Sequence, residues 1–197
     1  MITNEEILQN FTSRKTELAQ SAEITLLGHS LFDFWRQDKN YPAMLNGKSF
    51  NNWGFAGITA KQYIEVILNA NMIKQLGKDV FIFLGVNDIV KEPDYSPQKL
   101  VEWLNEILTK LQKIAPHSRY YLLEATPVRD RDTLENEPII EQNNYIRSHL
   151  PKGITFIPTW QNFIDNSGKL DRTLTTDGLH FSEAGYQVLK KILLQYL

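Results

Sequence analysis

Short apolar runs, each about the length of one strand, constrain the fold of this chain more than any other feature. Four of them are continuous rather than alternating, at residues 23–27, 79–84, 119–125 and 154–158, and a weaker candidate lies at 48–52. Continuous runs of this length are typical of strands that are covered on both faces, as in a parallel sheet. The sequence therefore indicates a parallel sheet buried between layers of helices.

Helical patterns separate these runs. The clearest begins with Ser96 as its N-cap and Pro97 at its first position, and Pro116 ends it. A helix is expected from Thr3 to Leu18, because Thr3 and Glu6 have the spacing of a capping box. Further helices are expected over residues 58–70, over residues 136–149 and after Ser182. Strands that alternate with helices are joined by right-handed crossovers, so the pattern predicts an α/β chain with a doubly wound sandwich.

Length and composition set the broad class. With 197 residues the chain is expected to form a single domain, residues 1–197, with a sizeable core. A hydrophobic fraction of 42% and a charged fraction of 22% are ordinary for a globular protein. The formal net charge is -2, whereas proteins that bind nucleic acids or membrane surfaces usually have an excess of basic residues. Neither a nucleic acid nor a membrane is therefore expected as a partner. The oligomeric state has no signature here, and a homodimer stays open.

The chain contains no cysteine, which excludes disulfides, thiolate metal sites and a cysteine nucleophile. The first residues, MITNEEILQNF, lack the basic stretch and apolar core that a signal peptide has. No apolar stretch approaches the ~20 residues that a membrane helix needs. A cytoplasmic location is therefore expected.

Unusual residues follow the candidate strands, at the carboxyl edge where a doubly wound sheet binds its ligands. GHS (28–30) ends the first run, NNWGFAG (51–57) follows the second candidate strand, and GVND (85–88) follows the third. TTDGLHFSEAGY (175–186) lies beyond the fifth. The four stretches are therefore expected to meet at one site.

Ser30 has two histidines that could serve as its base. A serine hydroxyl is a poor nucleophile until a base takes its proton. His29 is adjacent in the chain, but neighbouring side chains point to opposite faces of a strand, or about 100° apart on a helix, so it reaches the serine poorly. Taken alone, GHS reads more simply as a turn glycine followed by a helix cap.

His180 is the better candidate base. Asp177 precedes it by three residues, and the turn through Gly178 can fold the carboxylate onto one imidazole nitrogen, which leaves the other nitrogen to face Ser30. Two alternatives stay open: Asp177 caps a turn while His180 merely precedes a capped helix, or the two residues bind a metal. The metal alternative is the weaker, because the pair supplies only two ligands and no other cluster has metal spacing.

Acyl transfer also needs hydrogen-bond donors for the negative charge on the substrate oxygen. Gly54 could offer a backbone N–H with no side chain in the way, Asn87 its side-chain amide, and Ser30 its own N–H at the start of a helix. The plainer alternative makes Gly54 and Gly57 ordinary turn residues, and Asn87-Asp88 a pair that caps a helix.

Together and in this order, the four stretches resemble the SGNH hydrolases, also called the GDSL esterase/lipase family. GHSL (28–31), NNWGFAG, GVND and DGLHFSEAGY are similar to the family's GDSL, N-x-G-x-x-G, G-x-N-D and D-x-x-H blocks, so the resemblance covers about residues 24–190. It implies a flavodoxin-like three-layer α/β/α sandwich with a five-stranded parallel sheet. It also implies hydrolysis of carboxylic esters without metal or cofactor, with most similarity to the small acetylhydrolase-like branch.

Carried over by position, the resemblance implies a nucleophile, a base and its partner at Ser30, His180 and Asp177, and an oxyanion hole formed by Ser30, Gly54 and Asn87. Two positions depart from the family pattern. His29 stands where the family usually has aspartate, and Phe32 stands where threonine is common. We expect His29 to bond a nearby backbone carbonyl rather than take part in the reaction.

The expected function is that of a serine esterase, which hydrolyses a small-molecule ester with a short, acetyl-type acyl group. The alternative is a non-catalytic or weakly active module on the same fold that binds an acylated sugar. A flavodoxin-like mononucleotide binder is disfavoured, because neither G-x-G-x-x-G nor a P-loop follows the first run. Acetylated carbohydrates and other short acyl esters both stay open as substrates.

Overall fold

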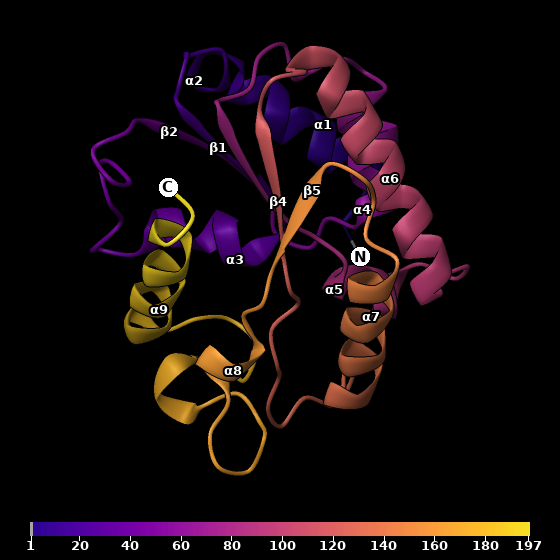
Figure 1. Ribbon diagram of the computed structural model, residues 1–197, viewed down its shortest axis with the longest axis vertical. Coiled ribbons are helices and arrows are strands. Elements are labelled where there is room, and N and C mark those ends of the chain that lie inside the picture. Colours follow the sequence, from indigo (N-terminus) through magenta and orange to yellow (C-terminus); the bar gives the residue numbers. More distant parts are fainter. Residues whose placement is uncertain (1) are drawn as a thin grey trace.

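Five parallel strands form the centre of the molecule in the computed structural model, which describes residues 2–197 (Figure 1). They are β1 (Ile24–Gly28), β2 (Phe50–Gly54), β3 (Asp79–Phe83), β4 (Arg119–Leu123) and β5 (Ile154–Ile157), in the spatial order β2-β1-β3-β4-β5. Each neighbouring pair runs parallel. The five-stranded parallel sheet expected from the apolar runs and the family resemblance is therefore confirmed.

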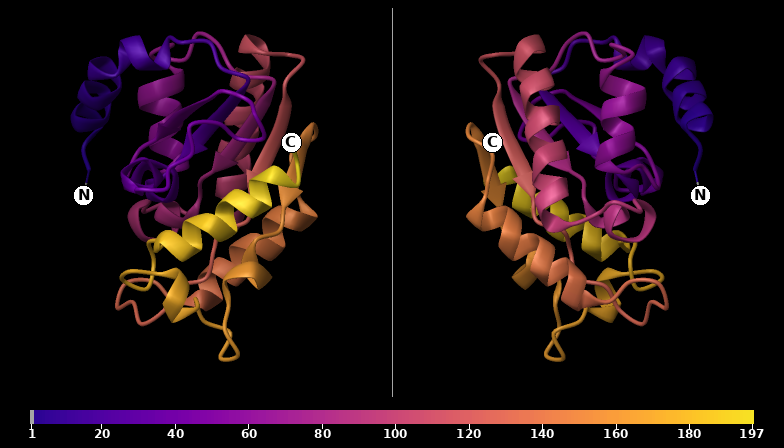
Figure 2. Two further views of the ribbon diagram at one scale, coloured as in Figure 1. Left: turned by 90° about the vertical axis from the view of Figure 1, so that its left-hand side faces the viewer. Right: turned by 90° about the vertical axis from the view of Figure 1, so that its right-hand side faces the viewer.

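Helices cover both faces of this sheet and complete the expected three-layer α/β/α sandwich (Figure 2). One face carries α1 (Asn4–Ser13), α2 (Lys15–Leu18), the short α4 (Ala60–Gln62) with the π-helix η2 (Tyr63–Leu68), and α6 (Pro97–Ile114). The other carries α3 (Ser30–Asp33), the 3-10 helix η1 (Phe34–Gln37) and α9 (Glu183–Leu194). The remaining helices are α5 (Val86–Lys91), α7 (Asn136–Ser148), α8 (Trp160–Phe163) and the 3-10 helix η3 (Arg172–Leu174).

Alternation along the strands explains why their apolar runs are continuous. In β3, Val80 and Ile82 belong to the core shared with α6, whereas Phe81 and Phe83 belong to the core shared with α9. Successive side chains of a strand point to opposite faces, so a strand covered on both faces needs apolar residues at every position. The sheet is thus buried between two cores, and its free carboxyl edge is left to hold polar residues.

The helix caps agree with the sequence, with two differences in helix form. The Ser96 hydroxyl accepts the Lys99 N–H at 3.1 Å at the start of α6. The helix expected from Thr3 to Leu18 is divided at Arg14 into α1 and α2, and the Arg14 guanidinium donates to the Asn52 carbonyl at 2.6 Å. The helix expected over residues 58–70 is mostly π-helix. Within residues 2–197, none of the helices combines the length and the apolar character that crossing a membrane requires.

Candidate active site

The loops at the carboxyl edge of the sheet, the lower end of the molecule in Figure 1, surround a cavity of about 410 Å³. Ser30 lines it from the start of α3, Asn87 from α5 and His180 from the loop before α9. The other lining residues are Ile2, Phe34, Ala56, Gly57, Val86, Val90, Lys91, Arg131, Thr133, Leu134 and Leu179. Three of the four sequence stretches thus contribute their predicted polar residues to one cavity.

Ser30 and His180 are hydrogen-bonded across 150 positions of sequence. The Ser30 Oγ lies 3.1 Å from His180 Nε2, and the serine side chain is almost fully buried at the first turn of α3. His29 is in an extended conformation just before this turn, so its side chain and that of Ser30 leave the chain in different directions. The histidine that is adjacent in sequence is therefore not the one that contacts the serine.

Asp177 holds the other side of the His180 ring. Its Oδ2 lies 2.8 Å from His180 Nδ1, and its Oδ1 accepts the backbone N–H groups of His180 at 2.8 Å and of Leu179 at 3.0 Å. Burial raises the pKa of Asp177, but these hydrogen bonds outweigh it and hold the pKa below its ordinary value. An ionised Asp177 accepts a hydrogen bond from the Nδ1–H group, which leaves Nε2 as the unprotonated nitrogen that can take the Ser30 hydroxyl proton.

A tight turn positions Asp177 and His180 together. Gly178 has a φ of +86°, and a Cβ added there would lie 1.9 Å from the Arg129 carbonyl oxygen, so only glycine fits. The backbone N–H of Arg129 donates to the Gly178 carbonyl at 2.8 Å. The loop after β4 therefore braces the turn that aims His180 at Ser30.

Asn87 remains a candidate oxyanion donor in this geometry. One N–H of its side-chain amide donates to the Ile58 carbonyl at 2.9 Å, which fixes the orientation of the amide at the cavity wall. An amide nitrogen carries two protons, so the second is available to a ligand. The Ser30 N–H lies at the first position of α3, where a helix leaves its N–H groups without intrahelical acceptors.

Gly54 does not occupy the position expected of it. Its N–H donates to the Asn52 side-chain oxygen at 2.9 Å, and the residue is not among those that line the cavity. A Cβ at Gly54 would come within 2.5 Å of the Asp33 nitrogen, so this glycine allows β2 and α3 to pack closely. In this geometry the Gly54 N–H is not free to donate to a ligand, contrary to the prediction, because the Asn52 side chain already accepts it. Gly57, three residues further along the same loop, lines the cavity instead.

His29 also differs from its expectation. Its Nδ1 accepts the Leu31 N–H at 3.3 Å, so the ring caps α3 instead of donating to a carbonyl. Its side chain is fully buried and packs on Phe83, with 4.7 Å between the ring centroids. Burial, followed by the charges of His180 and Lys91, lowers the pKa of His29 to about 3. His29 is therefore neutral at physiological pH and supports the serine turn as a cap.

Sequence reasoning missed three residues of this cavity. Lys91 donates from Nζ to the Gly57 carbonyl at 2.7 Å, and a signal for it existed, because Lys91 follows Asn87 by four residues and shares its helix face. Arg131 donates from Nη1 to the Asp177 carbonyl at 3.2 Å. Phe34 lies against His180, with 4.8 Å between the ring centroids. For Arg131 and Phe34 the sequence offered no comparable signal.

The residues described in the structure also bear on the metal alternative. Among residues 2–197, no group of three or more His, Cys, Asp or Glu side chains is arranged to hold a metal ion. Asp177 is instead hydrogen-bonded to His180 and to two backbone N–H groups. Its carboxylate oxygens are thus used to orient the imidazole.

Comparison with solved structures gives the same fold. A Streptococcus pneumonia protein named after platelet activating factor superposes with a TM-score of 0.83 and 25% identity, covering 98% of this chain and 92% of the other. A GDSL-like lipase from Bacteroides thetaiotaomicron superposes with a TM-score of 0.70 and 19% identity, covering 96% and 97%. The fold of this chain is thus that of known GDSL-type proteins.

Sequence comparison adds a curated relative and a family. An N-acylneuraminate cytidylyltransferase of Escherichia coli O18:K1:H7 is 35% identical over 186 residues, which cover 94% of this chain and 43% of that protein. The chain thus spans less than half the length of the curated relatives it matches. Residues 26–188 match the model of the GDSL-like Lipase/Acylhydrolase family, a range that holds all four motif stretches. The chain belongs to the GDSL-like lipase/acylhydrolase family.

Proposed function

We propose that this protein is a serine esterase that removes short, acetyl-type acyl groups from small-molecule esters. The observation that carries the proposal is the chain of two hydrogen bonds from Ser30 Oγ to His180 Nε2 and from His180 Nδ1 to Asp177. A hydroxyl, an imidazole and a carboxylate in this order can activate an oxygen nucleophile at neutral pH. The proposed reaction uses these side chains and water, with no cofactor.

Each proton in the proposed cycle has a place to go. The Ser30 oxygen attacks the ester carbonyl while His180 Nε2 takes the hydroxyl proton. Asp177 stabilises the resulting imidazolium through its hydrogen bond to Nδ1. His180 then gives the proton to the departing alcohol, which leaves an acyl group on Ser30. Water, activated by the same imidazole, attacks this acyl-enzyme and releases the acid.

Three donors are proposed to stabilise the oxyanion: the Ser30 N–H, the Gly57 N–H and the free N–H of the Asn87 amide. Gly57 replaces Gly54 in this role, because it lines the cavity together with Ser30 and Asn87. Each donor fixed in advance lowers the barrier by about 3–4 kcal/mol. Three polar side chains of α5 and that of the following Glu92 contact residues 57–60 and keep this loop in place; the three in α5 are Asn87, Asp88 and Lys91.

A sugar acid that carries an O-acyl group is the substrate candidate that the relatives favour. The Escherichia coli relative is named for a reaction of N-acylneuraminate, and most of this chain matches part of that protein. The cavity of about 410 Å³ is large enough for a short acyl group and part of a sugar. The alternative, a non-catalytic module that binds an acylated sugar, does not require the Ser30–His180–Asp177 hydrogen bonds.

Steady-state hydrolysis of p-nitrophenyl esters of increasing chain length, with O-acetylated sugars alongside, tests the proposal. We expect turnover of the acetyl ester to fall by at least about 1,000-fold in Ser30→Ala and His180→Ala, because either change removes the activated nucleophile. Ser182→Ala is the matched control, because the Ser182 hydroxyl caps α9 and donates to the Thr173 carbonyl at 2.7 Å, and Ser182 does not line the cavity. Unchanged turnover in Ser30→Ala would refute the esterase, whereas a folded protein that binds sugars but never turns over would favour the binding module.

A further inference from the structure

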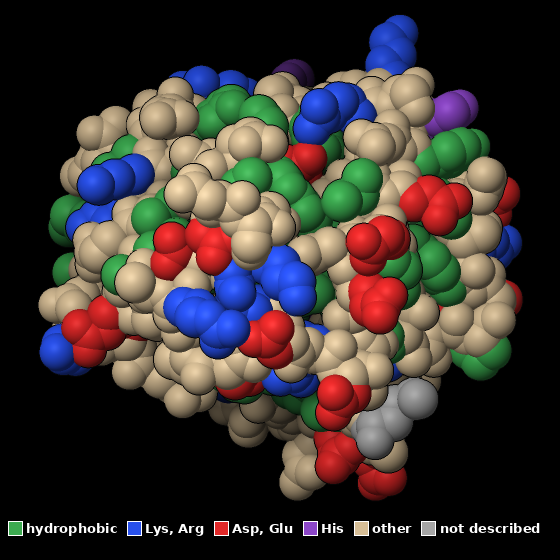
Figure 3. Space-filling view, turned by 90° about the horizontal axis from the view of Figure 1, so that it is seen from below, with side chains coloured by type: hydrophobic (Ala, Val, Ile, Leu, Met, Phe, Trp, Pro, Cys, Tyr) green, Lys and Arg blue, Asp and Glu red, His purple; other side chains and the backbone are tan. Residues whose placement is uncertain are grey.

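The charge of the candidate active-site cavity is one-sided. Of the described residues that line it, Lys91 and Arg131 are basic, and none of the lining side chains is a carboxylate. Asp177 lies behind His180, outside the lining. Figure 3, which views the molecule from below, shows Lys and Arg side chains gathered near the middle of this face with carboxylates beside them. A ligand in the cavity therefore meets two cations.

The positive charge of Lys91 is available to an anionic ligand. Its ammonium donates to an uncharged acceptor, the Gly57 carbonyl, at 2.7 Å, and lies against the open face of that glycine. Burial lowers the pKa of Lys91, while the charge of Asp88 opposes this shift. Burying a cation without a carboxylate partner is costly, and an anionic ligand would relieve that cost.

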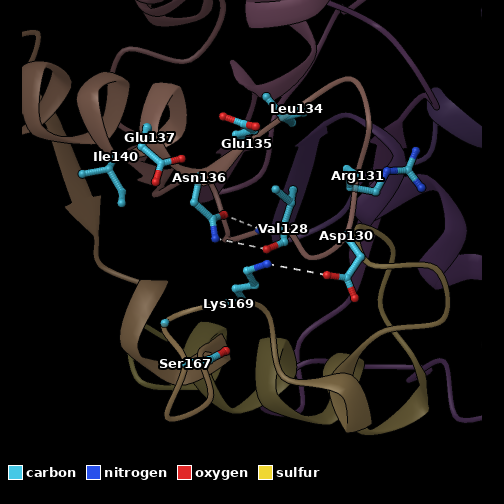
Figure 4. A pocket seen from close by; sticks show the side chains of 11 residues that line it. Val128, Asp130, Arg131, Leu134, Glu135, Asn136, Glu137, Ile140, Ser167 and Lys169 are labelled. Atoms are coloured by element: carbon cyan, nitrogen blue, oxygen red, sulfur yellow. Dashed lines mark hydrogen bonds and ion pairs between the residues drawn. The ribbon is translucent and has the colours of Figure 1, made fainter.

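Arg131 faces the cavity from the opposite loop. One of its guanidinium nitrogens, Nη1, lies 3.2 Å from the Asp177 carbonyl and 3.6 Å from Asp177 Oδ2. An arginine has five N–H donors, so Nη1 uses only part of its capacity. In Figure 4 the Asp130 carboxylate turns toward Lys169, while the Arg131 side chain extends away from both. Arg131 borders two cavities, the one that holds Ser30 and a neighbouring one of about 430 Å³. Its side chain is directed away from the neighbouring cavity.

Two other basic residues, Lys169 and Arg172, share one carboxylate. Lys169 lies 3.6 Å and Arg172 lies 2.8 Å from the two oxygens of Asp130. Neither residue lines the cavity that holds Ser30. Of the two basic side chains in the cavity, Arg131 has only the 3.6 Å ion pair with Asp177, and Lys91 forms no ion pair with a carboxylate among residues 2–197.

We propose that Lys91 and Arg131 select esters that carry a negative charge, with a carboxylate near the scissile bond as the favoured group. The inference rests on the proposed esterase and narrows its substrate to anionic esters. Lys91 also orients the glycine loop through its bond to the Gly57 carbonyl, so its removal lowers turnover of every ester. Selectivity is therefore measured as a ratio of two substrates, which a purely structural defect would leave unchanged.

The test compares 4-acetoxybenzoate, which is anionic, with its neutral methyl ester, following release of the phenol. Both lose the same acetyl group, and each kcat/KM is divided by the rate of imidazole-catalysed hydrolysis to remove intrinsic reactivity. At low ionic strength the wild type should prefer the anion by at least about fivefold, as expected for a partly screened charge. Added salt should reduce the preference.

Arg131→Gln and Lys91→Gln should each reduce this ratio by at least about threefold, since each removes one of the two charges. Arg172→Gln is the matched control: it deletes an equal charge from the same face, outside the cavity, and should leave the ratio unchanged. If one cavity variant fails to fold, the other decides. A wild-type ratio at or below one, or a ratio that both cavity variants preserve, would overturn the inference.

The same assay separates this inference from the proposed esterase. If Ser30→Ala still hydrolyses both esters at the wild-type rate, the esterase itself is refuted. If Ser30→Ala is inactive toward both while the wild type treats the two alike, the esterase stands and the anion selectivity fails.

Discussion

Two adjacent residues, His29 and Ser30, have different physical roles although each could take part in acid–base chemistry. His29 is fully buried and accepts the Leu31 N–H through Nδ1, so its own proton sits on Nε2. Among residues 2–197 that Nε2 has no hydrogen-bond partner. A second proton would place a charge in the core, and burial, followed by the charges of His180 and Lys91, therefore lowers the pKa of His29 to about 3.

The first prediction concerns the pH dependence of stability. Between its ordinary pKa of 6.5 and about 3, His29 takes up a proton only in the unfolded chain, so stability is lost as pH falls through this window. The loss should reach roughly 2 kcal/mol by about pH 5. His29→Asn keeps a capping oxygen and should flatten this dependence in urea unfolding at pH 7.5 and 5. His117→Asn, at an exposed histidine, is the control; equal slopes in wild type and His29→Asn would contradict the account.

The second prediction tests the amide donor. Asn87→Ala should lower kcat by about 100-fold with little change in KM, because the lost hydrogen bond forms to the oxyanion and not to the ground state. Asn105→Ala removes an exposed asparagine of α6 that does not line the cavity, and it should leave kcat within a few-fold of wild type. A large rise in KM with unchanged kcat would show that Asn87 serves substrate binding instead.

At the scale of elements, hydrogen bonds from side chains of α7 to the loop after β4 help to position the active-site residues. On α7, Asn143 bonds both backbone groups of Ala125 at 3.1 and 2.8 Å, and Asn136 bonds both of Val128 at 2.7 and 3.1 Å. These bonds fix the segment after β4, from which Arg129 braces the Gly178 turn. The Gly178 turn sets the orientation of His180. The helix α7 therefore affects the site through the loop after β4 and through this turn.

The third prediction follows from that bracing. Gly178→Ala would place a methyl group 1.9 Å from the Arg129 carbonyl, so the turn must move and carry His180 away from Ser30. We expect turnover to fall by at least about 100-fold, since displacements of about 1 Å in an active site have effects of that size. Gly168→Ala is matched to it, because φ there is also positive, at +74°, but a Cβ would meet nothing within 4 Å. Similar losses in both variants would show backbone strain, and not the clash, to be the cause.

At the scale of the whole molecule, the sheet separates two cores, and the catalytic candidates lie at the edge of both. Ser30, in α3, and His180, just before α9, lie on the side of the sheet that α9 covers. Gly57, in the loop after β2, and Asn87, in α5, lie nearer the side that α6 covers. The active arrangement therefore requires the two faces to be folded together. Loss of either core should remove the site.

The fourth prediction measures that coupling. Leu189 of α9 is fully buried, so Leu189→Ala should cost about 2–5 kcal/mol of unfolding free energy. Ile140→Ala, at a side chain that is 42% exposed, should cost much less. Urea unfolding followed by circular dichroism, with esterase activity measured in parallel, should show activity lost in the same transition as structure. Activity lost well before structure would instead indicate a site that opens locally.

The sequence predicted those features that depend on local periodicity and on capping. Continuous apolar runs identified four of the strands, the weaker candidate at residues 48–52 overlaps β2, and Ser96 and Ser182 marked helix starts correctly. The choice between Gly54 and Gly57 could not be made, because it depends on where β2 ends and on the Asn52 side chain that occupies the Gly54 N–H. The cavity role of Arg131 depends on the loop after β4, whose path is set by side-chain contacts with Asn136 and Asn143 of α7 that periodicity does not reveal.

The central claim is that His180 activates Ser30 as a nucleophile, and covalent labelling tests it most directly. A fluorophosphonate probe should add once per molecule to the wild type, and peptide mass spectrometry should place the adduct on Ser30. His180→Gln, with folding verified by circular dichroism, should label at least about 100-fold more slowly, because the serine then lacks its base. Labelling at any other residue, or equally fast labelling of Ser30 in His180→Gln, would contradict the account.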